Sequence, residues 1–234
     1  MRGPRPIRNS PLILWSIVFS LGLSCHRELR NDQIWDGETL GQLAVPLVAH
    51  RHLLNAREAP LGNLVSDALL EEARRVFPGT AAAVIRGRLL GYDEIRIPAG
   101  IYPAGPFRAE MAKDIFRFRE PFFVGEVSGA RLQTLFEQAL KLYPRDSPVF
   151  LQVSRGMRVE LREAAAGRQV AVRIDGRLVD AQARYLVASP NLGVWGDEQP
   201  LLVGSMIEAL EAYVTRHGSV APAVEGRVLG PFGL

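Results

Sequence analysis

The sequence predicts an α+β domain in which helices cover mixed β-sheets. Segments 61–76 and 130–142 have the three- and four-residue apolar spacing of amphipathic helices, and the short apolar run 81–85 between them is typical of a buried strand. Several strand-like runs and a closing helix-like segment follow, so helices and strands come in runs rather than in strict alternation. Without a fixed-period repeat or a dividing linker, we expect one domain over residues 43–228, followed by a short tail at 229–234.

Residues 1–25 have the order of a bacterial export signal. Three arginines precede the apolar run from Leu12 to Leu23, and Ser24 and Cys25 follow it. The run is shorter than the ~20 residues that span a bilayer, so we expect a cleaved signal peptide rather than a transmembrane helix. Cys25 is the only cysteine of the chain.

The residues GLSC that end this segment resemble a bacterial lipoprotein box, although Gly22 stands where leucine is usual and Leu21 lies one step earlier. Two alternatives remain, namely lipidation at Cys25 or ordinary signal cleavage. We expect an exported chain in the cell envelope, anchored to a bacterial membrane by lipid on Cys25, with residues 26–42 as a polar tether.

The charge balance argues against nucleic acid as a partner. The formal net charge is +3, from 28 basic and 25 acidic residues. Three of the basic residues, Arg2, Arg5 and Arg8, lie in the signal segment, and without them the two signs balance. A nucleic-acid-binding domain usually carries a basic surplus in its folded part.

The first half of the domain predicts a strand, a helix, a second strand and a long loop. Residues 43–50 favour a short edge strand, because Pro46 cannot donate to a sheet. The helix at 61–76 ends at Phe77-Pro78-Gly79, and the strand at 81–85 follows. Residues 86–107 are rich in Gly and Pro and predict a loop of the length that is often functional.

The second half predicts a strand at 122–128, a helix at 130–142 and then mostly strands. Asp175-Gly176 is a typical hairpin turn. Residues 189–200 predict a loop and residues 201–215 a last helix, which ends before Gly218. The expected strands are 149–153, 157–161, 170–174, 177–179 and 184–188.

The residues themselves indicate no catalytic machinery and no resident metal. The four histidines occur without a metal-ligand spacing, and no nucleophile or phosphate-loop motif is present. His50 and His52 would share one face of a strand, although a solvated or capping role is favoured. The aromatic cluster at 114–123 is either a surface for base stacking or a strand with one buried face, and composition favours the second.

Several blocks, in this order, resemble the C-terminal domain of the secreted and periplasmic 5′-nucleotidase and UDP-sugar hydrolase family. The similarity extends over about residues 43–228. It implies that family's layered α/β sandwich fold. The blocks are REAPLGNLVSDALLEEA at 57–73, AAAVI at 81–85, FFVGEVSGARLQTLFEQAL at 122–140, LQVSRGMRVEL at 151–161, VRIDGRLVDAQARYLVASPN at 172–191 and PAVEGRV at 222–228.

The resemblance implies nucleotide chemistry shared between two domains. Family members are phosphohydrolases whose N-terminal domain holds two metal ions that activate water. Their C-terminal domain holds the nucleoside between two aromatic rings and the phosphate with arginines. Residues 26–42 leave no room for the metal domain. We therefore expect no catalytic residue and no cofactor on this chain, and divalent metals only in a separately encoded metallophosphatase chain.

On the phosphate side, the family's motif maps onto Arg86 and Arg88. Arg86 stands where the family has an asparagine, and Gly91 where it has an arginine, with Arg88 supplying charge nearby. The first stacking ring maps onto Phe118, for which burial in the core is the alternative. At Arg86 and Gly91 the chain thus departs from the residues with which the family holds phosphate.

On the nucleoside side, the family's second ring maps onto Leu192, after Pro190 and Asn191, and Trp195 is the aromatic residue that can take its place in space. Asp197 matches the acidic residue that meets the ribose, although a structural Gly-Asp turn is the alternative. We expect the substrate-binding residues to be Arg86, Arg88, Phe118, Asn191, Trp195 and Asp197.

Two functions follow from the resemblance. The first is an exported domain that recognises a nucleoside or nucleotide and needs a metallophosphatase partner for catalysis. The alternative is a degenerate, non-catalytic binding or scaffold lipoprotein that has lost nucleotide specificity. An independent hydrolase has no motif to support it.

Overall fold

A computed structural model describes residues 34–231 of the chain, apart from residues 117, 119, 166 and 197 and the side chain of Leu192. The predicted signal peptide, the lipidation site Cys25, most of the tether and the site residue Asp197 lie outside the described residues. Within the described part, no helix is both long and apolar enough to cross a membrane.

A five-stranded mixed sheet lies at the centre of the molecule, with the order β12-β6-β11-β3-β7. Strands β3 and β11 are parallel, with Ala83 opposite Ala188, and the other neighbours are antiparallel. The strands are β3 (Thr80–Arg86), β6 (Pro121–Ser128), β7 (Leu151–Val153), β11 (Arg184–Ser189) and β12 (Leu201–Ser205).

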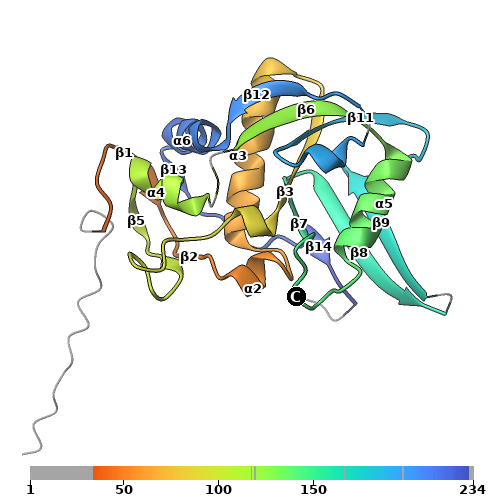
Figure 1. The fold of residues 1–234 in the computed structure, drawn as a ribbon, viewed down its shortest axis with the longest axis horizontal. Helices are drawn as coiled ribbons and strands as arrows, with labels where there is room; N and C mark the ends of the chain where they lie inside the picture. The colour runs from red at the N-terminus through yellow and green to blue at the C-terminus, as the bar shows by residue number, and fades with distance from the viewer. Residues whose placement is uncertain (1–33, 117, 119, 166, 197, 232–234) are drawn as a thin grey trace, which may run out of the picture.

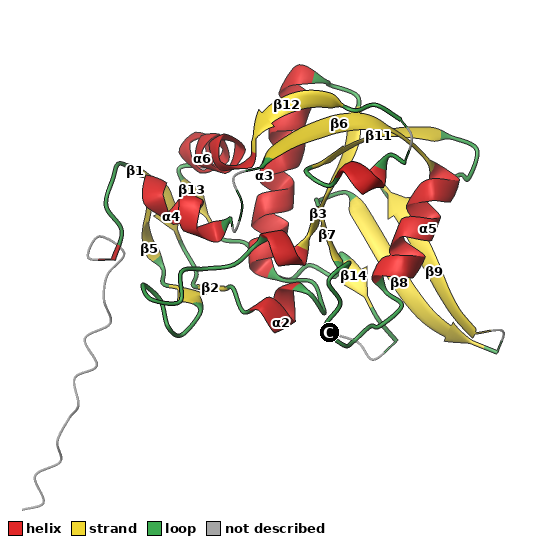
Figure 2. Cartoon of the chain, viewed as in Figure 1, coloured by secondary structure: helices red, strands yellow, loops and turns green. Residues whose placement is uncertain are grey.

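Both faces of this sheet are covered, as Figures 1 and 2 show. Helices α3 (Pro60–Val76) and α6 (Met206–His217) lie on one face, and α5 (Gly129–Ala139) lies on the other with strands β8 (Met157–Ala164) and β9 (Gly167–Ile174). Alternate residues of β3 enter two separate cores: Ala83 and Ile85 pack with α3, whereas Ala82 and Val84 pack with α5. The α+β class and the layered fold are thereby confirmed.

Smaller sheets and short helices surround this centre. A four-stranded sheet has the order β10-β9-β8-β14, a three-stranded sheet the order β13-β1-β5, and a ladder joins β2 to β4. The remaining elements are β1 (Thr39–Leu43), β2 (Leu47–Val48), α2 (Arg51–Leu54), η1 (Gly87–Leu89), β4 (Ile101–Tyr102), β5 (Gly105–Arg108), α4 (Ala109–Ile115), β10 (Arg177–Leu178), η2 (Leu192–Val194), β13 (Ser219–Val220) and β14 (Val228–Leu229).

The prediction of a helix at 201–215 is wrong for its first five residues. They form the edge strand β12, and α6 begins only at Met206. The apolar residues at 201, 202, 206 and 210 suit a helix, but the open edge of β6 offers backbone hydrogen bonds to Leu201 and Leu202, whose side chains stay exposed. Gly218, with φ 66°, ends α6 as expected.

The amino-terminal half also departs from the prediction. Strand β1 begins at Thr39, within the segment expected to be a tether, and it pairs with β5 and β13. The long loop expected at 86–107 contains η1, β4 and the start of β5, and the helix α4 was not predicted. These elements are two to seven residues long, too short for periodicity to reveal them.

Candidate functional site

Three segments of the chain meet at one end of the central strands. Strands β3 and β11 run parallel, so η1 after β3 and η2 after β11 emerge at the same end of the sheet. Strand β6 is antiparallel to β11, which places Glu120, just before β6, at that end too. The edge beyond the carboxyl ends of parallel strands is a common place for ligand sites in α/β folds.

A pocket of about 100 Å³ lies between these segments. It is lined by Arg86, Arg88, Leu89, Glu120, Pro190, Asn191 and Gly193. The fold therefore brings together three of the predicted substrate-binding residues, Arg86, Arg88 and Asn191. Glu120 and Gly193 line the pocket as well, and neither was among the predicted substrate-binding residues.

Arg86, Arg88 and Glu120 line the pocket, so its charged side chains sum to +1. Burial lowers the pKa of Arg86, and the positive charge of Arg88 lowers it further. Among the described residues, neither side chain forms an ion pair or hydrogen bond, and Glu120 makes no ion pair with them. Because guanidinium groups stay charged and suit planar or tetrahedral oxyanions, this arrangement favours an anionic ligand.

Asn191 contributes an unused polar group to the same pocket. It is only 8% exposed, and its Oδ1 has no hydrogen-bond partner in the described part of the chain. Its backbone N–H donates to Ser189 Oγ at 3.0 Å, which holds the start of the loop. Buried polar side chains are nearly always hydrogen-bonded in folded proteins, so a ligand is a reasonable partner for this amide.

Close packing holds η1 and η2 in place. A Cβ atom on Gly87 would lie 1.8 Å from the carbonyl oxygen of Leu54, so only glycine lets η1 approach the end of α2. From α5, Arg131 donates to the carbonyl oxygens of Gly193 at 2.6 Å and Val194 at 3.4 Å. The pocket walls are therefore supported by two neighbouring helices.

The predicted aromatic residues are not gathered around the pocket. Phe118 is 52% exposed, which excludes its burial in the core, and its role as a stacking ring stays a prediction. Trp195 is only 3% exposed, donates its indole N–H to the carbonyl of Val187 at 3.3 Å and packs edge-on against Phe123. The structure thus places Trp195 in the core below η2 and not on the wall of the pocket.

His50 and His52 contact neighbouring side chains in the structure. His52 is exposed and lies 3.0 Å from Asp146, and His50 packs edge-on against Tyr92. Within the described residues, no group of three or more His, Cys, Asp or Glu side chains is arranged to hold a metal ion.

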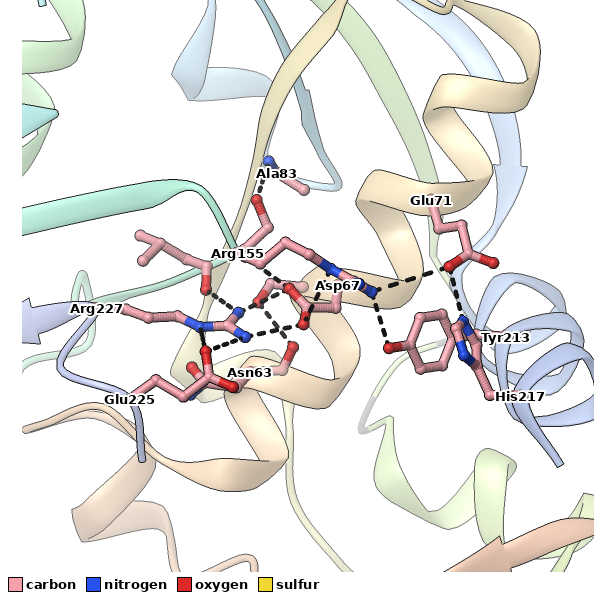
Figure 3. A network of polar contacts seen from close by, with 12 residues as sticks. Asn63, Asp67, Glu71, Ala83, Arg155, Tyr213, His217, Glu225 and Arg227 are labelled. Carbon is pink, nitrogen blue, oxygen red and sulfur yellow. Dashed lines mark hydrogen bonds and ion pairs between the residues drawn. The ribbon is translucent and has the colours of Figure 1, made fainter. Parts of the chain in front are cut away.

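A second polar network, which the sequence did not single out, joins α3 to the last part of the chain (Figure 3). Arg227 makes two hydrogen bonds to the carboxylate of Asp67, at 2.7 and 2.9 Å, and also donates to the carbonyl oxygen of Val153. Buried Glu58 accepts from the backbone N–H groups of Glu225 and Arg227. Glu58 and Asp67 lie in the block 57–73, and Glu225 and Arg227 lie in the block 222–228. Their place in these two blocks was the only signal in the sequence for this network.

The fold and the pocket define a class of protein, a layered α+β domain with a cationic pocket at the carboxyl ends of its central strands. The comparison with protein families makes the class specific, because the model of the 5′-nucleotidase C-terminal domain matches residues 39–201. The chain belongs to that family.

Individual relatives agree with this assignment. A 5′-nucleotidase of Diplobatis ommata is 25% identical over 217 residues, which cover 82% of this chain and 37% of the relative. The crystal structure of a 5′-nucleotidase precursor from Thermus thermophilus superposes with a TM-score of 0.70 at 23% identity, over 83% of this chain and 39% of that one. A sulfate thiohydrolase from Thermus thermophilus, solved with glycerol, superposes with a TM-score of 0.62 at 16% identity, over 82% and 35% of the two chains. The chain thus spans less than two fifths of each relative.

Proposed function

We propose that this chain is an exported nucleotide-recognition domain whose Arg86–Arg88 pocket takes the anionic part of the ligand. The observation that carries the proposal is the pair of arginines, which form no ion pair with any described residue, beside the amide oxygen of Asn191, which has no hydrogen-bond partner among the described residues. The family relationship supports nucleotides as the ligand class, because the matched relative from Diplobatis ommata is a 5′-nucleotidase. Phe118, half exposed two residues before Glu120, is the proposed stacking ring for the base.

The proposal assigns no catalysis to this chain alone. The described residues hold no cluster of metal ligands. A separately encoded metallophosphatase chain would supply the metals and the activated water. Export rests on the leader and its lipobox-like GLSC, which would anchor the domain in the cell envelope through Cys25.

The size of the pocket favours a second candidate, a binding or scaffold lipoprotein without nucleotide specificity. About 100 Å³ is well below the ~300 Å³ at which small-molecule pockets usually begin, so a nucleoside would have to lie outside, against Phe118. Arg86 also extends beneath η2, where an added Cβ on Gly193 would lie 3.9 Å from its Nη2. A small oxyanion fits such a site without a base.

Calorimetric titration of the full chain with AMP, adenosine and inorganic phosphate separates these candidates. Nucleotide recognition predicts that AMP binds best, that Arg88→Gln weakens AMP about tenfold through loss of a charged hydrogen bond, and that Phe118→Ala weakens AMP and adenosine by roughly five- to a hundredfold through loss of stacking. Arg155→Gln changes an arginine that lines a different pocket; it is the matched control and should leave AMP binding unchanged.

Two other results would decide against nucleotide recognition. If phosphate binds as tightly as AMP and Phe118→Ala changes nothing, the site accepts only the oxyanion. If no ligand binds a chain that is folded by circular dichroism, the scaffold candidate replaces the first.

A further inference from the structure

A second and larger pocket lies on the α3–α6 side of the molecule. Its volume is about 410 Å³, and it is formed by α3, α6 and the segment from Ser219 to Arg227. It shares no residue with the Arg86–Arg88 pocket, so a ligand of this second pocket is independent of the proposed function. Its size lies within the range of pockets that bind small molecules.

Four charged side chains of alternating sign form a row along this pocket. Glu225 lies 2.9 Å from Arg227, Arg227 lies 2.7 Å from Asp67, and Asp67 lies 3.5 Å from Arg155. Figure 3 shows Glu225 and Arg227 at one end, Arg155 with Tyr213 at the other, and Asp67 between them. The four charges sum to zero, so the row as a whole attracts neither an anion nor a cation strongly.

The inner members of the row are buried and fully engaged. Arg227, with 5% of its side chain exposed, donates from all three guanidinium nitrogens to Asp67, Glu225 and the carbonyl oxygen of Val153. Asp67 accepts from Arg227 and from the backbone N–H of Arg155 at 2.6 Å. A ligand therefore cannot add to the middle of the row.

The two ends of the row are partly exposed. The Arg155 side chain is 47% exposed, and its Nη1 has no partner among the described residues, although Nη2 donates to the hydroxyl of Tyr213 at 2.9 Å and lies 3.9 Å from a carboxylate oxygen of Glu71. The Glu225 side chain is 51% exposed, and only its Oε2 has a partner among the described residues. The pocket thus offers an unpaired hydrogen-bond donor at one end and an unpaired carboxylate oxygen at the other.

Asn63 is independent evidence that a hydrogen-bond partner is missing from this pocket. It lines the pocket and is 1% exposed, and its Oδ1 has no hydrogen-bond partner in the described part of the chain. Its Nδ2 donates to Glu58 at 2.6 Å and to the carbonyl oxygen of Ala223 at 2.8 Å, which places the amide near the Glu225 end. This end therefore has a second acceptor for a ligand N–H group.

We infer that this pocket binds a small zwitterion, an amino acid or a short peptide, with its ammonium group at Glu225 and Asn63 and its carboxylate at Arg155. A ligand with a single charge would pair with one end and leave the other open, whereas a zwitterion pairs with both at no net charge. Because the Asp67 carboxylate and the Arg227 guanidinium lie between the ends, a di- or tripeptide spans them better than an α-amino acid.

A peptide series of increasing length tests this inference on the full chain. Calorimetric titrations with glycine, diglycine and triglycine should show saturable binding that tightens with length. Triglycine with an acetylated amino end, or with an amidated carboxyl end, should bind about tenfold more weakly, because each cap removes one charge-assisted hydrogen bond. Arg155→Gln and Glu225→Gln should each weaken triglycine by a similar factor, and Arg88→Gln, in the other pocket, should not.

The failure of this site is distinguishable from failure of the nucleotide site. Equal binding of capped and uncapped triglycine, or unchanged binding by both variants, would overturn the zwitterion inference whatever AMP does. The same holds if a folded chain gives no heat with triglycine at its solubility limit. Arg155 and Glu225 are half exposed, so at least one of the two variants is expected to fold, as circular dichroism will check.

Discussion

At the residue scale, Gly125 is required by a close approach of an aromatic ring. It lies in β6 opposite Val187, and a Cβ atom there would lie 2.6 Å from Cδ1 of Trp195. Gly125→Ala should therefore lower the free energy of unfolding by about 1–3 kcal/mol, as overpacking of a core does, and displace Trp195 below η2. Urea unfolding measures the first effect and tryptophan fluorescence the second.

Gly204→Ala is the matched control for this substitution. Gly204 lies in the neighbouring strand β12, pairs with Phe122 of β6 and has open space where a Cβ would be. We expect this variant to differ from the native chain by less than about 0.5 kcal/mol. An equal loss in both variants would mean that the strand itself, and not the contact with Trp195, requires glycine.

At the element scale, Glu71 joins α3 to α6 and makes their packing sensitive to acid. Burial opposes its charge, but hydrogen bonds from His217 at 2.9 Å and Arg216 at 2.7 Å hold the pKa of Glu71 below its ordinary value of 4.5. A carboxyl group with a lowered pKa in the folded state stabilises the fold above pH 4.5, and that contribution disappears as the pH falls through the lowered pKa.

Glu71→Gln should therefore reduce the dependence of stability on pH in acid. At pH 7 the variant should be less stable than the native chain, and the difference should shrink once the pH is well below 4.5. Urea unfolding at a series of pH values measures this difference. A constant difference at all pH values would show that the charge of Glu71 does not stabilise the α3–α6 contact.

Whether an element was predictable depended on its length and on what it packs against. Helix α3 has 17 residues and one apolar stripe, so its periodicity predicted it to within a residue. The Asp175-Gly176 hairpin was also predicted, because Asp and Gly tolerate the positive φ values that this turn requires. In the structure φ is 48° at Asp175 and 77° at Gly176. Strand β12 escaped prediction, since its pairing with β6 is not a property of its own residues.

At the scale of the whole molecule, the two hydrophobic cores share one sheet. The core around α3 and the core around α5 meet at β3, whose alternate side chains belong to each. Loss of either core would expose one face of that strand. We therefore expect a single unfolding transition, with coincident midpoints by far- and near-ultraviolet circular dichroism and by tryptophan fluorescence. Two separate midpoints would show that the α5–β8–β9 side unfolds independently.

The sequence by itself determined the fold class, the main helices and hairpin, and the family, because periodicity and block order are local properties of the chain. It also pointed to Arg86, Arg88 and Asn191. Only the tertiary structure placed these three in one small pocket, buried Trp195 and exposed Phe118, and joined Glu225 to Arg155 through a row of charges. The residues that meet in these sites lie about 100 to 160 positions apart in the chain, and sequence spacing carries no geometric information over such separations. They are brought together by the parallel pairing of β3 with β11 and by the packing of α3 against the last residues of the chain.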